Sequence, residues 1–267
     1  MTFTGVVWET WAKFLTQYQH ACQSCDLSDR SLFCLPVVGN PTPTPVADVG
    51  LAVWRWEDRI GRLDMTLYMD RALSSRFSHP LHHKVALAVV TELAGADSHL
   101  AQRLAAQDLS TIMDPFDCLK DFAAYRGWTA ESCQNASWDE GSIEIIDGKR
   151  MLHSAAAAVM GDRAEVTRRV WRGQVSVLYP FIEEQRVSII PQVRSYLRFP
   201  LETTFGQVDD AEDLEVGQLR HFLRGKAIPA RRWKLLNLLT EMRHALAHLE
   251  PVPLRSLLAE EILHVEE

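Results

Sequence analysis

The stretch that decides the fold of this chain is Arg231-Arg-Trp-Lys-Leu-Leu-Asn-Leu-Leu-Thr-Glu-Met-Arg-His-Ala-Leu-Ala-His-Leu249. Its apolar residues recur at intervals of four and three, at Leu235, Leu239, Met242, Leu246 and Leu249. This is the spacing with which an amphipathic α-helix turns one stripe toward a core. The pattern therefore predicts a helix over residues 230–249, ended by Pro251 and Pro253, with this stripe facing a core.

The opposite face of the same helix is polar. At about 100° per residue, it carries Asn237, Glu241, His244 and His248, with Arg243 on its flank. His244 and His248 are four residues apart and therefore lie one above the other. Two interpretations are open: a face that contacts water or a neighbouring domain, or a site for acid/base chemistry.

The segment before this helix divides into an acidic and a basic run. Residues 209–215 contain five acids, and residues 218–234 contain six basic residues and no acid. The basic residues, Arg220, Arg224, Lys226, Arg231, Arg232 and Lys234, are the candidate substrate-binding residues. They could hold the phosphates of RNA despite the net charge of −7. The alternative is that the two runs neutralise each other or face solvent.

Further from this helix, most of the chain also has helical periodicity. Helices are expected over residues 51–73, 84–106 and 162–197, with Pro180 and Pro191 bending or breaking the last. Asp147-Gly148 between two short strand-like runs predicts a β-hairpin. We therefore expect an all-α, mainly helical bundle with one small hairpin insertion.

This hairpin is the expected seam between two helical parts. The predicted division is an N-terminal helical region at 1–135, a hairpin seam at 136–153 and a second helical domain at 154–267. The 267 residues are 47% apolar and 24% charged, which is ordinary for a globular protein. The chain has no phosphate-binding loop, dinucleotide fingerprint or nucleophile elbow, which argues against an NTPase, a Rossmann enzyme or an α/β-hydrolase.

The cysteines and histidines supply only incomplete metal sites. Cys22, Cys25 and Cys34 resemble part of a zinc site but lack a second ligand pair, and Glu241, His244 and His248 lack a fourth ligand. We therefore expect no metal and no cofactor. An odd set of five cysteines suits a reducing cytoplasm, and the sequence predicts neither a signal peptide nor a membrane span.

The segment Glu241-Met-Arg-His-Ala-Leu-Ala-His-Leu-Glu-Pro251 resembles the Arg-polar-x-x-x-His motif of the HEPN superfamily, at Arg243 and His248. The resemblance implies that residues 154–267 form a HEPN-like helical domain with the motif on a late helix. Many members of that family are metal-independent ribonucleases of bacterial toxin and phage-defence systems. Others are interaction modules without activity, and the family also implies dimers.

The residues of the motif suit RNA cleavage. A histidine such as His248 can move the proton of the 2′-hydroxyl or of the leaving oxygen, and Arg243 can stabilise the charged transition state. His244 would orient the catalytic histidine or act as a second acid/base. Arg243 and His248 point about 140° apart on an ideal helix, so one complete site would need two copies.

Two functions are therefore consistent with these sequence features. The first is a HEPN-like subunit of a bacterial defence or toxin-type system that acts as a metal-independent endoribonuclease. The second is a catalytically inactive helical adaptor in a multi-protein assembly beside an NTPase. Catalysis needs Arg243 and His248 exposed, whereas an adaptor would bury one of them or pair Arg243 with Glu241 or Glu215. The expected partners are RNA, a second copy or another protein, and no membrane.

Overall fold

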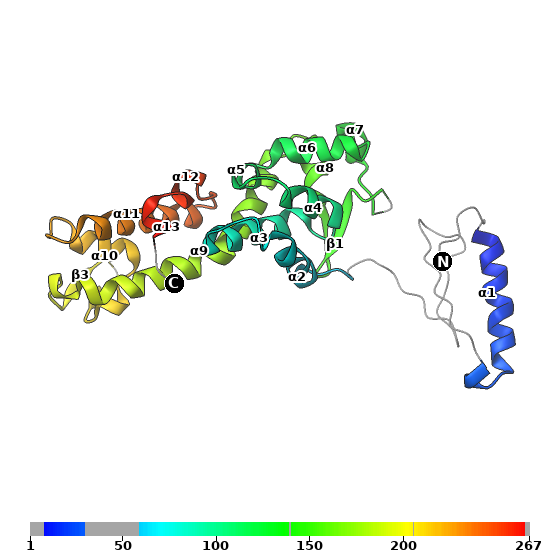
Figure 1. The fold of residues 1–267 in the computed structure, drawn as a ribbon, viewed down its shortest axis with the longest axis horizontal. Helices are drawn as coiled ribbons and strands as arrows, with labels where there is room; N and C mark the ends of the chain where they lie inside the picture. Colours follow the sequence, from blue (N-terminus) through cyan, green and yellow to red (C-terminus); the bar gives the residue numbers. More distant parts are fainter. Residues whose placement is uncertain (1–7, 30–58, 139, 205, 265–267) are drawn as a thin grey trace.

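The computed structural model describes residues 8–29, 59–138, 140–204 and 206–264, and most of them are helical (Figure 1). The first helices are α1 (Trp8–Gln23), α2 (Arg62–Leu73), α3 (Pro80–Ala94), α4 (Ser98–Ala105), α5 (Leu109–Met113), α6 (Phe116–Tyr125) and α7 (Ala130–Gln134). The second group is α8 (Ser154–Val159), α9 (Arg163–Val193), α10 (Val216–Leu223), α11 (Ala230–Ala247), α12 (Leu254–Leu257) and α13 (Glu260–Leu263). Short 3₁₀ turns occupy Leu27–Asp29, Arg194–Tyr196 and Ala211–Asp213. The predicted mainly helical fold is confirmed.

The predicted hairpin is present. Strands β1 (Ile143–Ile146) and β2 (Lys149–Leu152) pair antiparallel, with Ile146 opposite Lys149. Asp147 and Gly148 form the turn, and both have a positive φ, of 51° and 72°. This is the backbone geometry for which an Asp-Gly pair is selected in two-residue hairpins.

A second hairpin was not predicted. Strands β3 (Leu201–Thr203) and β4 (Gly206–Val208) pair antiparallel with Leu201 opposite Val208. Strands of three residues are too short to establish an alternating pattern in the sequence. The acidic run contains a 3₁₀ turn at Ala211–Asp213, and helix α10 begins directly after it at Val216.

The helix expected over residues 84–106 is two helices. Helix α3 ends at Ala94, and Gly95 has a φ of 58°, which a helix cannot continue. Asp97 then starts α4 by accepting hydrogen bonds from the backbone N–H groups of His99 and Leu100. Of the helix expected over residues 51–73, α2 covers the last part, and residues 51–58 lie outside the described residues.

Helix α9 is the longest element, with 31 residues. Pro180 and Pro191 were expected to bend or break it, and both lie inside the continuous helix without breaking it. Leu178, Ile182 and Ile189, which lie near the two prolines, are fully buried, and this packing offsets the backbone hydrogen bonds that proline removes. Figure 1 shows α9 joining the part that contains α2–α8 to the part that contains β3, α10, α11 and α13.

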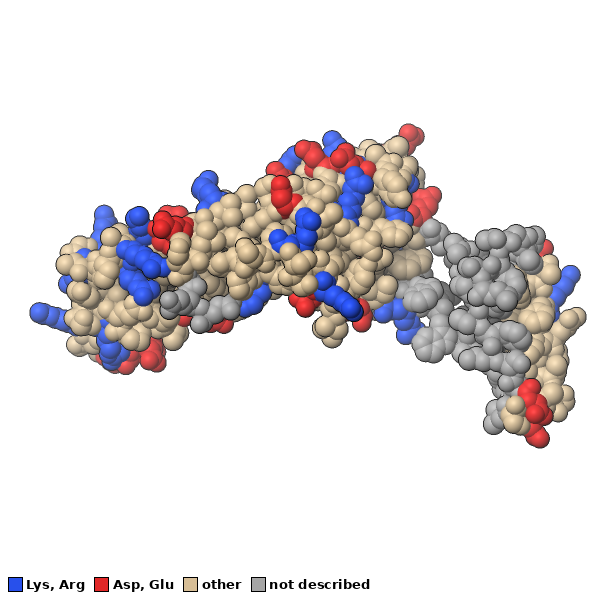
Figure 2. Space-filling view, viewed as in Figure 1, with Lys and Arg blue, Asp and Glu red and all other residues tan. Residues whose placement is uncertain are grey.

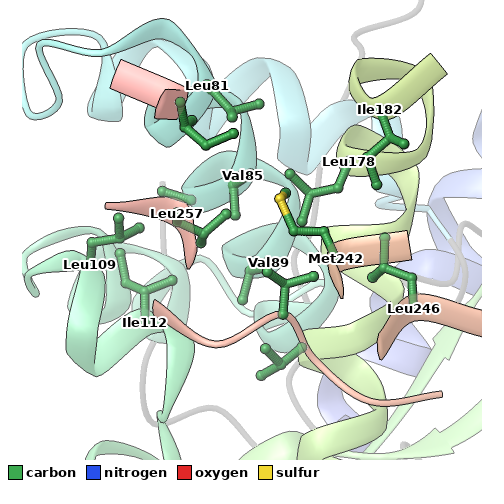
Figure 3. Packing of buried hydrophobic residues seen from close by; sticks show 14 of the residues in the cluster. Leu81, Val85, Val89, Leu109, Ile112, Leu178, Ile182, Met242, Leu246 and Leu257 are labelled. Carbon is green, nitrogen blue, oxygen red and sulfur yellow. The ribbon is translucent and has the colours of Figure 1, made fainter. Parts of the chain in front are cut away.

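The hydrophobic core takes residues from both sides of the expected seam at 136–153. In Figure 3, Val85 and Val89 of α3 lie near Leu178 of α9 and Met242 and Leu246 of α11. All five belong to one cluster of buried side chains. The N-terminal helices from α2 onward and the C-terminal helices therefore share a core.

Helices α3 and α9 approach each other closely at Gly173. A Cβ atom at this position would lie 2.6 Å from the Cα atom and 2.8 Å from the backbone nitrogen of Val89. It would also lie 3.0 Å from the carbonyl carbon of Ala88. Real Cβ atoms do not come this close to backbone, so only glycine fits between the two helices.

Gly173→Ala is therefore expected to lower the free energy of unfolding by about 1–3 kcal/mol, because backbone atoms cannot rotate away from the added methyl group. The sign opposes helix propensity, which favours alanine over glycine by up to about 1 kcal/mol. Urea denaturation followed by circular dichroism would measure the change. Gly217→Ala in α10 is the matched control, since a Cβ there meets nothing within 4 Å and should stabilise the helix slightly. Equal stabilisation by both variants would contradict the close approach of α3 and α9.

A buried polar network lies where the first hairpin meets the helices. Arg169 of α9 is 1% exposed, and its guanidinium bonds the Glu165 carboxylate, the Ser154 hydroxyl and the Leu152 carbonyl. The Ser154 hydroxyl in turn donates to the Leu93 carbonyl of α3. One side chain thereby ties α9 to the end of β2 and the start of α8.

The pKa values of two carboxylates beside this network are shifted in opposite directions. Glu144 of β1 is almost fully buried and accepts one hydrogen bond from the Ala96 backbone N–H, at 3.0 Å. Burial raises the pKa of Glu144, because the charged form loses hydration. Burial also acts to raise the pKa of Asp97, but interactions with His153 and the Leu100 N–H outweigh it and lower that pKa to about 2. Asp97 is thus held ionised, whereas burial favours the neutral form of Glu144.

Among the described residues, no helix is both long enough and apolar enough to cross a membrane.

Candidate functional site

The apolar stripe of α11 is buried as predicted, except at its end. Leu235, Leu239, Met242 and Leu246 are at most 3% exposed. The expectation that Leu249 continues the stripe is wrong, because α11 ends at Ala247 and Leu249 is 63% exposed.

A left-handed turn ends α11. Leu249 has a φ of 61°, and the backbone N–H of Glu250 donates to the Ala245 carbonyl at 2.9 Å. This is the usual bonding at a helix C-terminus, where glycine is the common residue. The turn directs the Leu249 side chain away from the core and leaves His248 as the cap of the helix.

The polar face brings the two histidines together. His244 and His248 are both exposed, and their ring centroids are 4.3 Å apart. Glu241 is exposed on the same helix, whereas the side-chain oxygen of Asn237 accepts a hydrogen bond from Arg220 of α10 at 2.6 Å. The predicted face therefore presents two adjacent imidazoles to solvent, whereas the side-chain oxygen of Asn237 is already hydrogen-bonded to Arg220.

The Arg243 side chain is held by an ion pair with an acid of the same chain. Its Nη2 atom lies 2.9 Å from Oε2 of Glu215, the residue directly before α10. The side chain of Arg243 is 32% exposed and that of Glu215 is 58% exposed. The Nε atom of Arg243 is buried and has no hydrogen-bond partner among the described residues. Of the two acids considered from the sequence, Glu215 is the one that pairs with Arg243.

The end of α11 is held by two side chains of α9 that the sequence did not indicate. The indole N–H of Trp171 donates to the Leu246 carbonyl at 2.8 Å. The buried amide of Gln174 donates to the Val252 carbonyl at 3.0 Å and accepts from the Val252 N–H at 2.6 Å. The only sequence signal for Gln174 was its place among the apolar residues of α9, and the helical spacing of Trp171 among Val and Leu favoured a core residue over a base-stacking one.

The six candidate basic residues do not form one free stripe. Arg220 bonds Asn237, Arg231 donates to the His264 carbonyl, and Lys234 lies 3.8 Å from Glu261. Arg224, Lys226 and Arg232 make no ion pair with the part of the chain that the structure describes. Figure 2 shows Lys and Arg side chains at the end of the molecule that carries α10 and α11, with acidic side chains among them.

The candidate metal site on α11 is not assembled. Within the described ranges, no three His, Cys, Asp or Glu side chains are placed to hold a metal ion, so Glu241 does not join His244 and His248. Cys22 is buried and Cys25 is exposed. Cys34 lies outside the described residues.

A groove of about 560 Å³ begins three residues beyond His248. Its walls are Ser110, Thr111, Met113 and Asp114 on one side and residues 251–254 on the other. His244, His248 and Arg243 do not line it, so the polar face of α11 is an open surface beside this groove.

Comparison of the chain with protein-family models, with curated proteins and with solved structures finds no match. The resemblance of residues 241–251 to the HEPN motif consequently stays a prediction.

Proposed function

We propose that this chain is a HEPN-like helical subunit of a bacterial defence or toxin-type system, acting as a catalytically inactive adaptor in a multi-protein complex. The observation that supports this choice is the pairing of Arg243 with Glu215. An arginine that stabilises a phosphorane-like transition state has to direct its charge at the reacting phosphate. An arginine bound to an acid of its own chain serves the fold instead.

The placement of the two motif residues agrees with this proposal. Arg243 is directed toward α10, while His248 caps the end of α11 and is exposed. A single copy therefore does not present both side chains to one substrate atom, as catalysis requires. The exposed end of α11, with its two imidazoles and the exposed Leu249, is instead suited to contact another protein. The odd, sparse set of five cysteines leads us to place the chain in the cytoplasm.

A metal-independent endoribonuclease is the second candidate, and the exposed His244–His248 pair favours it. One imidazole would take the proton of a 2′-hydroxyl, whose oxygen attacks the adjacent phosphorus. The other imidazole would protonate the 5′-oxygen as its bond to phosphorus breaks, leaving a cyclic phosphate and a 5′-hydroxyl. Arg243 would have to come from a second copy or leave Glu215.

The two candidates are separated by one experiment on the purified chain and the proteins encoded beside it. Total RNA is incubated with the wild type, Arg243→Ala, His244→Ala and His248→Ala, with and without EDTA, and assembly is followed by size-exclusion chromatography. The adaptor predicts no cleavage, co-elution of the wild type with a partner, and weaker co-elution for His248→Ala. Cleavage that survives EDTA and disappears in Arg243→Ala would establish the ribonuclease instead. If neither cleavage nor assembly is observed, both candidates are contradicted.

A further inference from the structure

Strand β1 carries an acid on its buried side. Glu144 and Ile146 are the two buried residues of the strand and lie two positions apart, so both side chains point to the same side of the hairpin. The Glu144 carboxyl lies directly against Gly95, where a Cβ atom would be 2.7 Å from Oε1 and 2.8 Å from Cδ. Because Gly95 belongs to the turn between α3 and α4, the hairpin meets this turn through the Glu144 carboxyl.

The Glu144 carboxyl has little to compensate for its burial. Its Oε1 accepts one hydrogen bond from the Ala96 backbone N–H at 3.0 Å, and its Oε2 is buried without a hydrogen-bond partner among the described residues. An ionised carboxylate needs several donors to replace its hydration, whereas a neutral carboxyl needs far fewer. This geometry suits the neutral acid and agrees with the raised pKa of Glu144, of which burial is the largest cause.

The charged and titratable groups that face Glu144 come from three other elements. Asp97 of the turn between α3 and α4 opposes the ionisation of Glu144, while His153 at the end of β2 and Arg169 of α9 favour it. The Asp97 carboxylate is itself held ionised and binds Arg126, which follows α6, at 2.7 Å. Ionisation of Glu144 would therefore place a second negative charge beside Asp97 in a buried site.

The two groups that favour ionisation are already bound to other partners. The Nδ1 atom of His153 accepts a hydrogen bond from the Ala155 N–H at 3.1 Å, so the ring is neutral with its proton on Nε2. The charge of Arg169 is paired with the Glu165 carboxylate at 3.0 Å. A buried charge on Glu144 would consequently lack a counter-ion of its own, which makes it unfavourable.

We propose that the β1–β2 hairpin is a proton-controlled latch on the turn between α3 and α4. While Glu144 carries its proton, the side chain stays buried and holds the Ala96 N–H. When the proton leaves to solvent, the carboxylate moves into water and the hairpin separates from the turn. The latch does not depend on the role of α11.

The direction of the pH dependence follows from the folded-state pKa of Glu144, which lies above its ordinary value of 4.5. The closed hairpin keeps its full stability below the ordinary value and loses it as the pH rises through the folded-state pKa. Release of one proton changes the opening equilibrium by at most about tenfold per pH unit.

The Ala96 backbone N–H reports on the latch, because it bonds the Glu144 carboxyl. Its hydrogen exchange is followed by NMR from about pH 5 to about pH 9 and expressed as protection relative to an unstructured chain. In the wild type, protection should fall as the pH rises, by up to about tenfold per pH unit. In Glu144→Gln, which keeps an oxygen for Ala96 but cannot ionise, protection should not change with pH.

Two controls separate the latch from a general loosening of the fold. The Thr111 N–H, which bonds the Asp108 carboxylate at 2.8 Å, should keep constant protection in the same samples, because hydrogen bonds lower the pKa of Asp108. Glu140→Gln is the matched variant, since Glu140 is exposed, lies three residues before β1 and carries the same charge. It should show the pH dependence of the wild type.

Protection of Ala96 that does not change with pH in the wild type, or that falls equally in Glu144→Gln, would overturn the proposal. If Glu144→Gln does not fold, the wild type decides through the comparison of Ala96 with Thr111. A fall at Ala96 alone supports the latch, and an equal fall at both amides contradicts it.

Discussion

Leu239→Ala is expected to lower the free energy of unfolding by about 2–5 kcal/mol, because it leaves a cavity in a fully buried part of the core. Leu239 is 0% exposed and lies in the middle of the α11 stripe. Its neighbours on the stripe, Met242 and Leu246, pack near α3 and α9, so the surrounding structure cannot collapse freely into the space (Figure 3). Urea denaturation measures the change as a lower midpoint with an unchanged slope.

The control for this prediction is Leu63→Ala in α2. Leu63 is 70% exposed, so its truncation removes the same atoms without opening a cavity and should change stability by less than about 0.5 kcal/mol. A loss below about 1 kcal/mol for Leu239→Ala would mean that α11 is rotated relative to the structure described here.

Arg169→Met is expected to cost about 2–5 kcal/mol, although methionine keeps most of the apolar stem. The substitution removes the donors that bond the Ser154 hydroxyl and the Leu152 carbonyl, and buried acceptors without donors are unfavourable. Glu165 keeps Arg168 and Arg172 as partners, which limits the loss. Thermal and urea denaturation should both detect the change.

Arg168→Met provides the comparison, because Arg168 bonds the same Glu165 carboxylate but is 60% exposed. Its loss should cost less than about 1 kcal/mol, as for exposed ion pairs in general. If the two variants were equally stable, the network around Arg169 would contribute nothing beyond a surface salt bridge.

The parts of the fold that the sequence predicts are those set by local pattern. The four-and-three spacing from Leu235 to Leu246 decides which face of α11 is buried, and Asp147-Gly148 decides the first hairpin. The predicted end of α11 at residue 249 is wrong, because Leu249 continues the apolar spacing although its backbone has left the helix. Spacing alone does not reveal a left-handed residue when that residue is not glycine.

The interactions that decide the candidate site join residues distant in sequence. Arg243 lies on α11 and Glu215 directly before α10, and the sequence offered Glu241 as an equally good partner. The contact of Gly173 with Val89 depends on how α3 and α9 cross, which no local pattern encodes. Composition and periodicity indicate which side chains are available, whereas the packing of helices decides which of them meet.

The pair of hydrogen bonds between the Gln174 side chain and the Val252 backbone ties the segment after α11 to α9. Gln174 follows Gly173 in the chain, so the residue that clamps the segment after His248 adjoins the residue that touches α3. Loss of the Gln174 side chain would therefore release the segment after His248 from α9, directly beside the contact between α9 and α3.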